Sequence, residues 1–356
     1  MKQLASTKRN YGIDLLRMVS MFLIVILHTL GHGGLLNALE VNSLSYHLAW
    51  ILETAAYCAV NCYAMISGYV GWRGRLKISN LLILWIQVAF YCLIFKLAES
   101  WCAGAPITLD LILEGLTPVS GNAYWYFTAY CGMFFFAPLV NAAVAHLPRQ
   151  QFLLATAGLL VLFSVYPTLD HTDIFETGWG YHALWLLTIY AVGAYLGKYQ
   201  PLQNWSAAGC LGLYWGMILV SWGWLALNNA YPELSDVRLI RYTSPTIVLE
   251  ALALLGLFTK IPVTGWLQKL VILFSTQSFG VYLIHDNLFV RKQFIKGKLA
   301  PLAAEAPFVM LGKVLLFVLA VYVICMLLDT LRHYLFRMLG LKNGLDKLEK
   351  KLFSEQ

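Results

Sequence analysis

The chain alternates long apolar segments with short polar ones along its whole length. A membrane-spanning helix needs about 20 consecutive, mainly apolar residues. Several of the apolar segments contain Gly or Pro, which membrane helices tolerate when neighbouring helices satisfy the freed backbone groups. We therefore predict an all-α, polytopic membrane helix bundle of about ten transmembrane helices, at residues 11–32, 47–70, 79–100, 124–145, 151–167, 181–198, 206–228, 244–260, 270–290 and 307–329.

The composition favours a membrane protein over a soluble one. Hydrophobic residues make up 60% of the 356 residues and charged residues only 12%, whereas soluble domains carry about 25% charged residues. The first apolar segment lacks a signal-peptide cleavage pattern, so we expect it to remain as a helix. The expected location is the cell (cytoplasmic) membrane, as a multi-pass protein, with the lipid bilayer as a partner.

The distribution of Lys and Arg predicts the orientation. If the N-terminus is inside, the inner segments hold 16 Lys and Arg residues and the outer segments hold 7. Cytoplasmic loops carry such an excess, so we expect both termini to be cytoplasmic. The net charge of +7 then reflects loop bias, and we expect no nucleic-acid partner. One predicted outer loop, RKQFIKGK at 291–298, breaks the trend; contact with an anionic acceptor, a local exception and a misplaced span are the alternatives.

Two domains are expected. The transmembrane bundle occupies residues 1–330, and a basic amphipathic cytoplasmic tail occupies residues 331–356. Alternating basic and apolar residues in the tail favour a helix lying on the anionic inner leaflet, with a partner-binding helix as the alternative. No soluble domain is inserted and no internal repeat is visible, so any chemistry is expected within the bundle or at its mouths.

Arg17 and His28 lie inside the first predicted span, within a strongly apolar stretch. Eleven residues make almost exactly three helical turns, so both side chains lie on one stripe, roughly 16 Å apart along the axis. Charged and titratable groups in a span are costly unless they are buried in protein and used. Asp14 precedes Arg17 by one turn and is positioned to pair with it. The stripe therefore predicts a functional site that faces other helices.

Further polar residues fall at similar predicted depths. His28 and Glu53 lie in the outer halves of the first two spans, and His285 lies near the outer end of the ninth. Depth alone would let these three side chains meet. The alternatives are a helix–helix hydrogen bond for Glu53, a structural role for His285, and capping or solvation of the span end for Asp286.

No metal cofactor is expected. The seven cysteines are scattered without metal-ligand spacing and are best explained as small packing residues. The predicted outer loop 169–182 gathers His171, Asp173, Glu176 and His182. Their spacing matches no familiar set of ligands, so this loop is interpreted as a polar, solvated segment, with an acceptor mouth as the alternative.

Four sequence blocks carry a resemblance to a known family. The R-x10-H motif of Arg17 and His28, preceded by GIDLLR, resembles the signature of the integral-membrane acyltransferase-3 family. The blocks ISGY (66–69), WYF (125–127), PLVN (138–141) and SFGVYLIH (278–285) follow in the expected order. Members have about ten spans and two cytoplasmic ends, and some add an SGNH-type domain. The resemblance therefore implies a bundle-only member without an SGNH domain.

The resemblance also implies an activity. Family members transfer acyl groups, most often acetyl from acetyl-CoA, to hydroxyls of surface carbohydrates. This chain is accordingly expected to be an O-acetyltransferase that uses acetyl-CoA as co-substrate and a cell-envelope or exported glycan as acceptor. His28 is the candidate base, because imidazole titrates near neutral pH, or a transient acyl carrier. Arg17 is the candidate partner of a CoA phosphate or of the pantetheine arm.

Supporting roles are assigned to residues close to these two. Glu53 or Asp286 is expected to orient the imidazole, and Glu53 is grouped with the catalytic residues. Asp14 joins Arg17 at the donor site, where the amides of Asn61 or Asn141 would polarise the thioester oxygen. The acceptor site is expected to include His285, Asp286, Trp125 and Tyr126, although an interfacial aromatic belt is the plainer interpretation of the last two.

Two other classes of function remain open at this point. Polar residues inside a bundle also mark translocation paths, so a transporter or flippase for a glycan or small solute is the main alternative. A non-catalytic membrane partner or sensor on the same scaffold is the second. A homo-oligomer is compatible with each of these functions.

Overall fold

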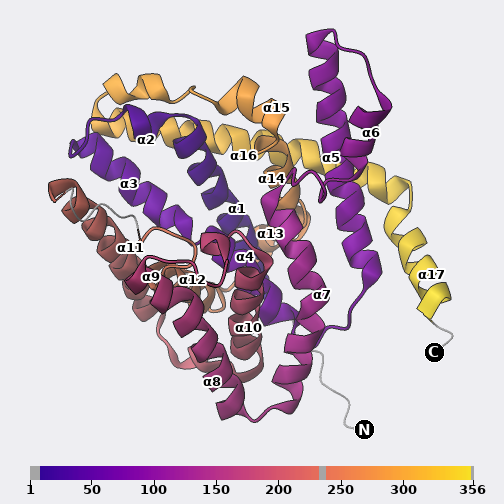
Figure 1. Ribbon diagram of the computed structural model, residues 1–356, viewed down its shortest axis with the longest axis horizontal. Helices are drawn as coiled ribbons and strands as arrows, with labels where there is room; N and C mark the ends of the chain where they lie inside the picture. The colour runs from indigo at the N-terminus through magenta and orange to yellow at the C-terminus, as the bar shows by residue number, and fades with distance from the viewer. Residues whose placement is uncertain (1–8, 232–237, 354–356) are drawn as a thin grey trace.

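The computed structural model describes residues 9–231 and 238–353, and these residues form helices without any strand (Figure 1). Seven helical segments within these ranges are long and apolar enough to cross a membrane. They are α1 (Tyr11–His32), α3 with α4 (Leu44–Tyr57 and Ala59–Gly71), α5 (Ile78–Ala103), α7 (Trp125–His146), α8 with η1 and α9 (Arg149–Leu160, Val161–Val165 and Tyr166–Asp170), α11 (Ala207–Ala230) and α16 (Pro307–Met338).

The other three predicted spans are helical but short or broken. Helix α10 (Ala183–Tyr199) has 17 residues and α12 (Pro245–Phe258) has 14, fewer than the roughly 20 of a straight span. The predicted continuous helix at 270–290 is wrong. In its place α13 (Gly265–Phe274) and α14 (Ser278–His285) meet at 51°, and together they count as an eighth span. The polar run STQS (275–278) interrupts the apolar sequence where the helix breaks.

Short helices connect and flank the long ones. The predicted outer loop at 291–298 is largely helical and packs on the end of α1, where Gly297 N–H donates to the carbonyl of His32 over 3.1 Å. The short elements are α2 (Leu35–Ala38), α6 (Leu109–Leu116), η2 (Gly178–Gly180), η3 (Pro201–Asn204), α15 (Leu288–Val290), η5 (Arg291–Ile295), η6 (Ala300–Ala304) and α17 (Leu341–Phe353).

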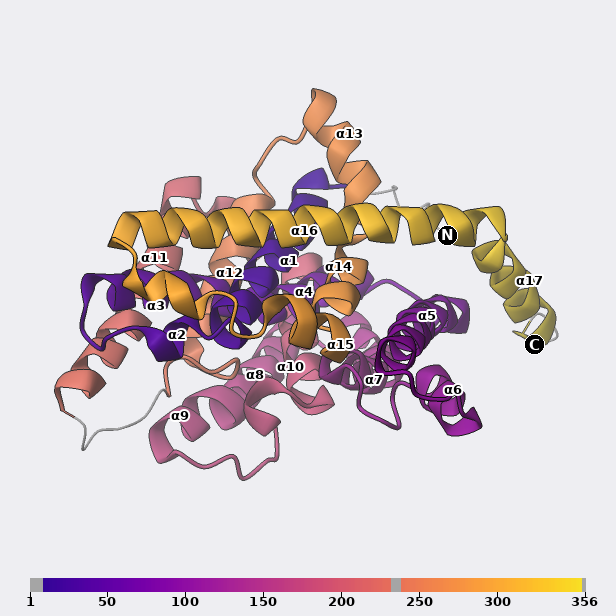
Figure 2. The same ribbon diagram turned by 90° about the horizontal axis from the view of Figure 1, so that it is seen from above.

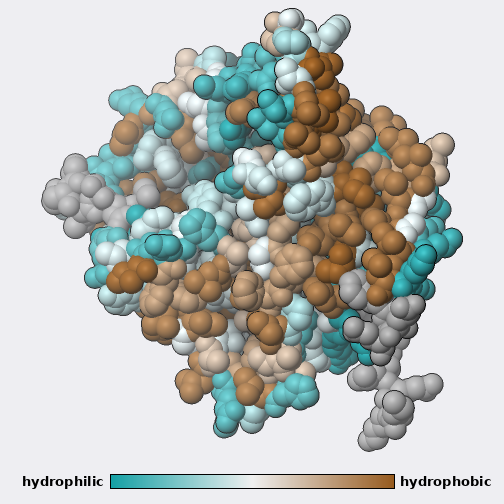
Figure 3. All heavy atoms as spheres, turned by 45° about the vertical axis from the view of Figure 1, so that its right-hand side comes forward, coloured by the Kyte–Doolittle hydropathy of each residue, from teal (hydrophilic) through white to brown (hydrophobic). Residues whose placement is uncertain are grey.

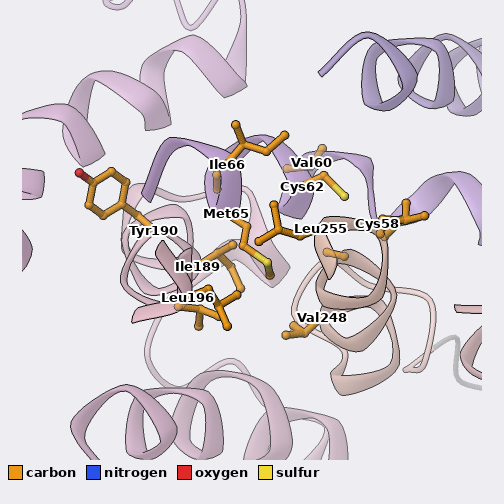
Figure 4. Packing of buried hydrophobic residues seen from close by; sticks show 14 of the residues in the cluster. Cys58, Val60, Cys62, Met65, Ile66, Ile189, Tyr190, Leu196, Val248 and Leu255 are labelled. Atoms are coloured by element: carbon orange, nitrogen blue, oxygen red, sulfur yellow. The ribbon is translucent and has the colours of Figure 1, made fainter. Parts of the chain in front are cut away.

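Helix α4 runs through the core, between α10 and α12 (Figure 4). Glycines let the α4 and α10 backbones approach closely, as in other membrane bundles. A Cβ at Gly68 would lie 1.9 Å from the Tyr190 carbonyl oxygen, and one at Gly193 would lie 2.0 Å from that of Met65. The close packing at Gly68 and Gly193 therefore holds α4, which contributes to the wall of the site described below.

The outside of the bundle is apolar. Figure 3 shows hydrophobic residues over much of the face that it presents. Along α16, large side chains are more than half exposed at Leu316, Ile324, Leu327 and Leu331. Exposed apolar area of this extent marks a surface that is not in contact with water. Together with the long apolar helices, it identifies a multi-pass membrane protein.

The tail folds back onto the start of α5. Helix α16 continues past residue 330 to Met338, and α17 leaves its far end at an angle (Figure 2). The Glu349 carboxylate accepts from the Ile78 backbone N–H over 2.6 Å and from the Ser79 hydroxyl over 2.6 Å. Glu349 therefore caps the N-terminus of α5 from another helix. The inner-leaflet placement of the tail stays a prediction, and residues 354–356 lie outside the described ranges.

We expect Gly193→Ala to destabilise the bundle, because the new methyl group cannot fit against the Met65 carbonyl. Overpacking of this kind costs about 1–3 kcal/mol, so thermal unfolding in detergent should shift to a lower temperature. Gly216→Ala in α11 is the control, since a Cβ there meets open space. Equal melting temperatures for the two variants would contradict the close packing.

We expect Glu349→Gln to loosen α17 and to speed limited proteolysis between α16 and α17. The hydrogen bond from Ser79 lowers the pKa of Glu349, with a further contribution from Ile78 N–H. The cap is therefore complete above the ordinary glutamate pKa and is lost as the pH falls through the lowered value. Proteolysis of the wild-type chain should accelerate in acid. Lys351→Gln, which changes charge on the same helix, should leave cleavage at neutral pH unchanged.

Candidate active site

One end of α1 opens into a large, positively charged cavity. It has a volume of about 760 Å³ and collects the start of α1 with the ends of α4, α10 and α12. Its wall includes one carboxylate, Asp14, and four cations, Arg9, Arg17, Arg73 and Lys260. Asp14 Oδ1 accepts from Arg17 over 2.7 Å, which confirms the predicted pair, and Oδ2 accepts from Arg9 over 2.6 Å. The cations outnumber the carboxylate, so the cavity is suited to a polyanion.

His28 lies three turns further along α1 and meets His285 from α14. Its Nδ1 is 2.9 Å from His285 Nε2, and His285 Nδ1 is 2.6 Å from the carbonyl oxygen of Val281. His285 is fully buried, whereas the His28 side chain is 16% exposed. The prediction from span depth that His28 and His285 could meet is therefore confirmed.

The chain of hydrogen bonds from His28 through His285 to Val281 determines which nitrogen of each neutral imidazole carries a hydrogen. A carbonyl oxygen only accepts, so His285 Nδ1 carries a hydrogen and donates it to Val281. His285 Nε2 then has a lone pair and accepts from His28 Nδ1–H. His28 Nε2 is left with an unshared pair, which is the form a general base requires.

Asp286 lies beside the relay, the hydrogen-bonded chain of His28, His285 and the Val281 carbonyl. Its Oδ1 lies 3.5 Å from His28 Nδ1, 3.7 Å from His32 Nε2 and 3.2 Å from an Arg291 nitrogen. Asp286 therefore lies within 4 Å of both histidines at the end of α1 and of Arg291. Arg291 belongs to the basic segment 291–298, so this segment contacts the site through the ion pair of Arg291 with Asp286.

Contacts on both faces of α14 fix the position of His285. The Tyr124 hydroxyl donates to the Leu283 carbonyl over 2.7 Å. On the α16 side Gly280 lies against Asp329, whose Cγ would be 1.9 Å from an added Cβ. Asp329 is itself held by Tyr91 at 2.8 Å and by Arg332 at 2.6 Å. The buried ion pair thus anchors the helix that carries the relay.

A narrow, mostly aromatic cavity adjoins His28. Its volume is about 20 Å³, enough for roughly one water molecule. Helices α4, α7 and α14 contribute to its wall, which includes Tyr63, Trp125, Tyr126, Phe279 and Tyr282 besides His28. The Tyr282 hydroxyl is buried and has no hydrogen-bond partner among the described residues.

A third cavity lies between the other two. It has a volume of about 180 Å³ and shares Arg17 with the charged cavity. It shares Tyr63, Tyr126 and Phe279 with the aromatic one. Neighbouring cavities therefore border α1 at both Arg17 and His28.

Comparison with known proteins identifies the family. A family model described as an acyltransferase domain, that of the acyltransferase-3 family, matches residues 10–330. The chain belongs to the acyltransferase-3 family. No curated protein and no solved structure matched it. The two histidines and the R-x10-H motif of this acyltransferase lie inside the matched region, and so does every cavity residue named above except Arg9.

Several predicted residues of the acyltransferase lie elsewhere. The orienting contacts to His28 come from His285 and Asp286, whereas Glu53 is buried on α3 with one carboxylate oxygen unpartnered. Asn61 bonds to the Tyr242 carbonyl and to the Trp185 indole. Asn141 bonds to the carbonyls of Gly71 and Gly74 and to the Tyr190 hydroxyl. Both amides are thus engaged by protein partners.

The predicted outer loop of the acyltransferase is organised by Asp173. Its carboxylate accepts from Thr177 N–H and Oγ1 and from Trp179 N–H. Partial burial alone would raise the pKa of Asp173, but these hydrogen bonds outweigh burial and lower it. The residue therefore shapes the loop as a charged acceptor, in keeping with a solvated segment.

Sequence reasoning missed most of the aromatic wall. Tyr63, Phe279 and Tyr282 were not singled out, although Tyr282 lies one turn before His285 within the SFGVYLIH block. That spacing on one helix is the signal that could have found it. Tyr63 gives no such signal, because its link to the site is a bond of 2.8 Å to the Arg17 carbonyl.

We expect His285→Leu to lower acyl transfer by about a hundredfold, the scale of general acid–base effects, because it removes the acceptor for His28 Nδ1–H. His285→Gln retains an acceptor and should restore part of the rate. Initial rates over a pH series would measure both. Equal rates for the Leu and Gln variants would show that His285 serves packing only.

Proposed function

We propose that this acyltransferase moves acetyl from cytoplasmic acetyl-CoA to a hydroxyl of a cell-envelope or exported glycan. The observation that carries the proposal is the unshared pair on His28 Nε2. His28 lines a cavity that shares wall residues with a second cavity, and the second cavity shares Arg17 with the cationic one. The acyltransferase family supports group transfer, and the positive-inside count supports a cytoplasmic mouth at Arg17.

The charged cavity suits the nucleotide part of CoA. Its 760 Å³ falls within the range of about 300–1,000 Å³ typical of ligand pockets. Arg9, Arg73 and Lys260 would bind phosphates through charge-assisted contacts, and the Trp72 ring in the same wall could stack on the base. Arg17 would hold the start of the pantetheine arm. Eleven residues of α1 rise roughly 16 Å, a suitable length for that arm to reach His28.

The proposed chemistry needs one base and no external reagent. His28 Nε2 takes the proton of the acceptor hydroxyl while the oxygen attacks the thioester carbonyl carbon. The C–S bond of the tetrahedral intermediate breaks, and the CoA thiolate takes the proton from the His28 imidazolium. Asp286 stabilises that imidazolium. The alternative route, through a transient acetyl-His28, uses the same nitrogen as nucleophile.

Tyr282 is the candidate donor to the oxyanion. Its hydroxyl is buried, and Tyr282 lines the same cavity as His28, with ring centroids 6.2 Å apart. A donor placed in a water-excluded site stabilises developing charge strongly. Asn61 and Asn141, considered for this role from sequence, already use their amides in the protein.

The aromatic wall suits a carbohydrate acceptor. Trp125 packs on Tyr181 at 4.4 Å between ring centroids and stacks on Tyr242 at 5.9 Å. Trp125 and Tyr126 also line the His28 cavity, so they face the site interior as well as the helix end. Aromatic faces pack against the apolar faces of sugars, and the 20 Å³ volume implies that an acceptor displaces side chains as it enters.

We expect His28→Ala to abolish transfer of labelled acetyl from acetyl-CoA to envelope glycan. The loss should reach at least a hundredfold, because the base or acyl carrier is removed. His146→Ala, at an exposed histidine at the end of α7, is the matched control and should keep full activity. Robust incorporation by a correctly folded His28→Ala variant would remove His28 from the mechanism.

The transporter alternative has one structural observation in its favour, the broken pair α13–α14, since transporters build sites at broken helices. The same preparation distinguishes the two functions. Glycan flux into vesicles without an ester product would support transport, whereas ester formation that depends on acetyl-CoA would support the acyltransferase.

A further inference from the structure

The break between α13 and α14 buries two serine hydroxyls. Ser275 is 6% exposed and Ser278 is 1% exposed. Ser278 interacts with the Tyr63 hydroxyl, whereas the Ser275 Oγ has no hydrogen-bond partner among the described residues. A buried hydroxyl without a partner is costly, so its position at a helix break indicates that something binds there.

Both serines line the middle cavity of about 180 Å³, and Arg17 lines it too. The same wall holds Thr276, Ser67 and Tyr130. Tyr63 also belongs to this wall, and its hydroxyl donates to the Arg17 carbonyl. The cavity wall thus offers hydroxyl donors and acceptors beside the Arg17 guanidinium.

We propose that the α13–α14 break is a subsite for the two amide groups of the donor's pantetheine arm, with Ser275 and Ser278 as its hydrogen-bonding residues. This subsite rests on the proposed function, because the arm must reach His28. A hydroxyl both donates and accepts, so it can serve an amide N–H or C=O. The bend in the helix, which leaves these side chains at the cavity wall, then has a binding role.

The size and polarity of the middle cavity argue against a nucleotide, a sugar or a lipid chain as its ligand. The cavity is smaller than the roughly 300 Å³ at which typical ligand pockets begin, so it suits an extended chain better than a nucleotide or a sugar. A lipid acyl chain would leave the Ser275 hydroxyl unpaired and would meet Arg17, at a cost. An amide-bearing chain satisfies both the narrow shape and the polar wall.

The test compares two ligands on the purified full-length chain in lipid nanodiscs. CoA carries the arm, and adenosine bisphosphate is its nucleotide half. We expect Ser275→Ala/Ser278→Ala to weaken CoA binding about tenfold, from two lost hydrogen bonds, and to leave the binding of adenosine bisphosphate unchanged. Ser20→Ala is the matched control. Ser20 is also buried with an unpartnered hydroxyl, but it does not line this cavity.

Each outcome of this experiment either supports or overturns the proposed subsite. Selective loss of CoA affinity in the double variant, with normal binding by Ser20→Ala, supports the subsite, and retained binding of the nucleotide half shows that the variant is folded. Unchanged CoA affinity in the double variant overturns the subsite and leaves the proposed function standing. Failure of the wild-type chain to bind CoA at all overturns the proposed donor and the subsite together.

Discussion

The hydrogen bond between His28 and His285 joins two residues that are 257 positions apart in the sequence, and the candidate site depends on it. It selects one tautomer of His28, and it does so only while His285 Nδ1 remains bonded to Val281 within the same helix. The position of α14 is in turn set by Gly280 against Asp329 and by Tyr124 at Leu283. A rotation of α14 would remove the partner of His28 Nδ1, and it would also move Phe279 and Tyr282 in the cavity wall.

Polarity changes in order along the path from Arg17 to His28. The first cavity is large and cationic, the second is lined largely by hydroxyl-bearing residues, and the third is aromatic and small. Charged phosphates are too costly to desolvate beyond the first cavity. Exclusion of water from the last cavity would protect a thioester from hydrolysis and strengthen the electrostatic contacts at His28. The order therefore favours one direction of entry for a donor with a charged head and an uncharged arm.

Local periodicity and composition were enough to predict the helical membrane fold, the Arg17–Asp14 pair and the common stripe of Arg17 and His28. They could not predict the partner of His28 Nδ1, because that contact depends on how α14 packs. The run STQS was visible, yet polar residues inside membrane helices often bond to neighbouring helices without breaking their own. Likewise, the predicted span at 244–260 is longer than the 14 residues of α12, because it includes polar flanking residues such as Ser244 and Lys260.

The contact of Glu349 with the first turn of α5 can form only after both helices have been synthesised. During synthesis α5 is complete some 250 residues before its cap exists. Until then its leading amide groups must rely on water or lipid headgroups at the membrane surface. Helix α17 therefore holds the start of α5 in place, and the loop between α4 and α5, which borders the charged cavity, reaches its final position only after α17 has been synthesised.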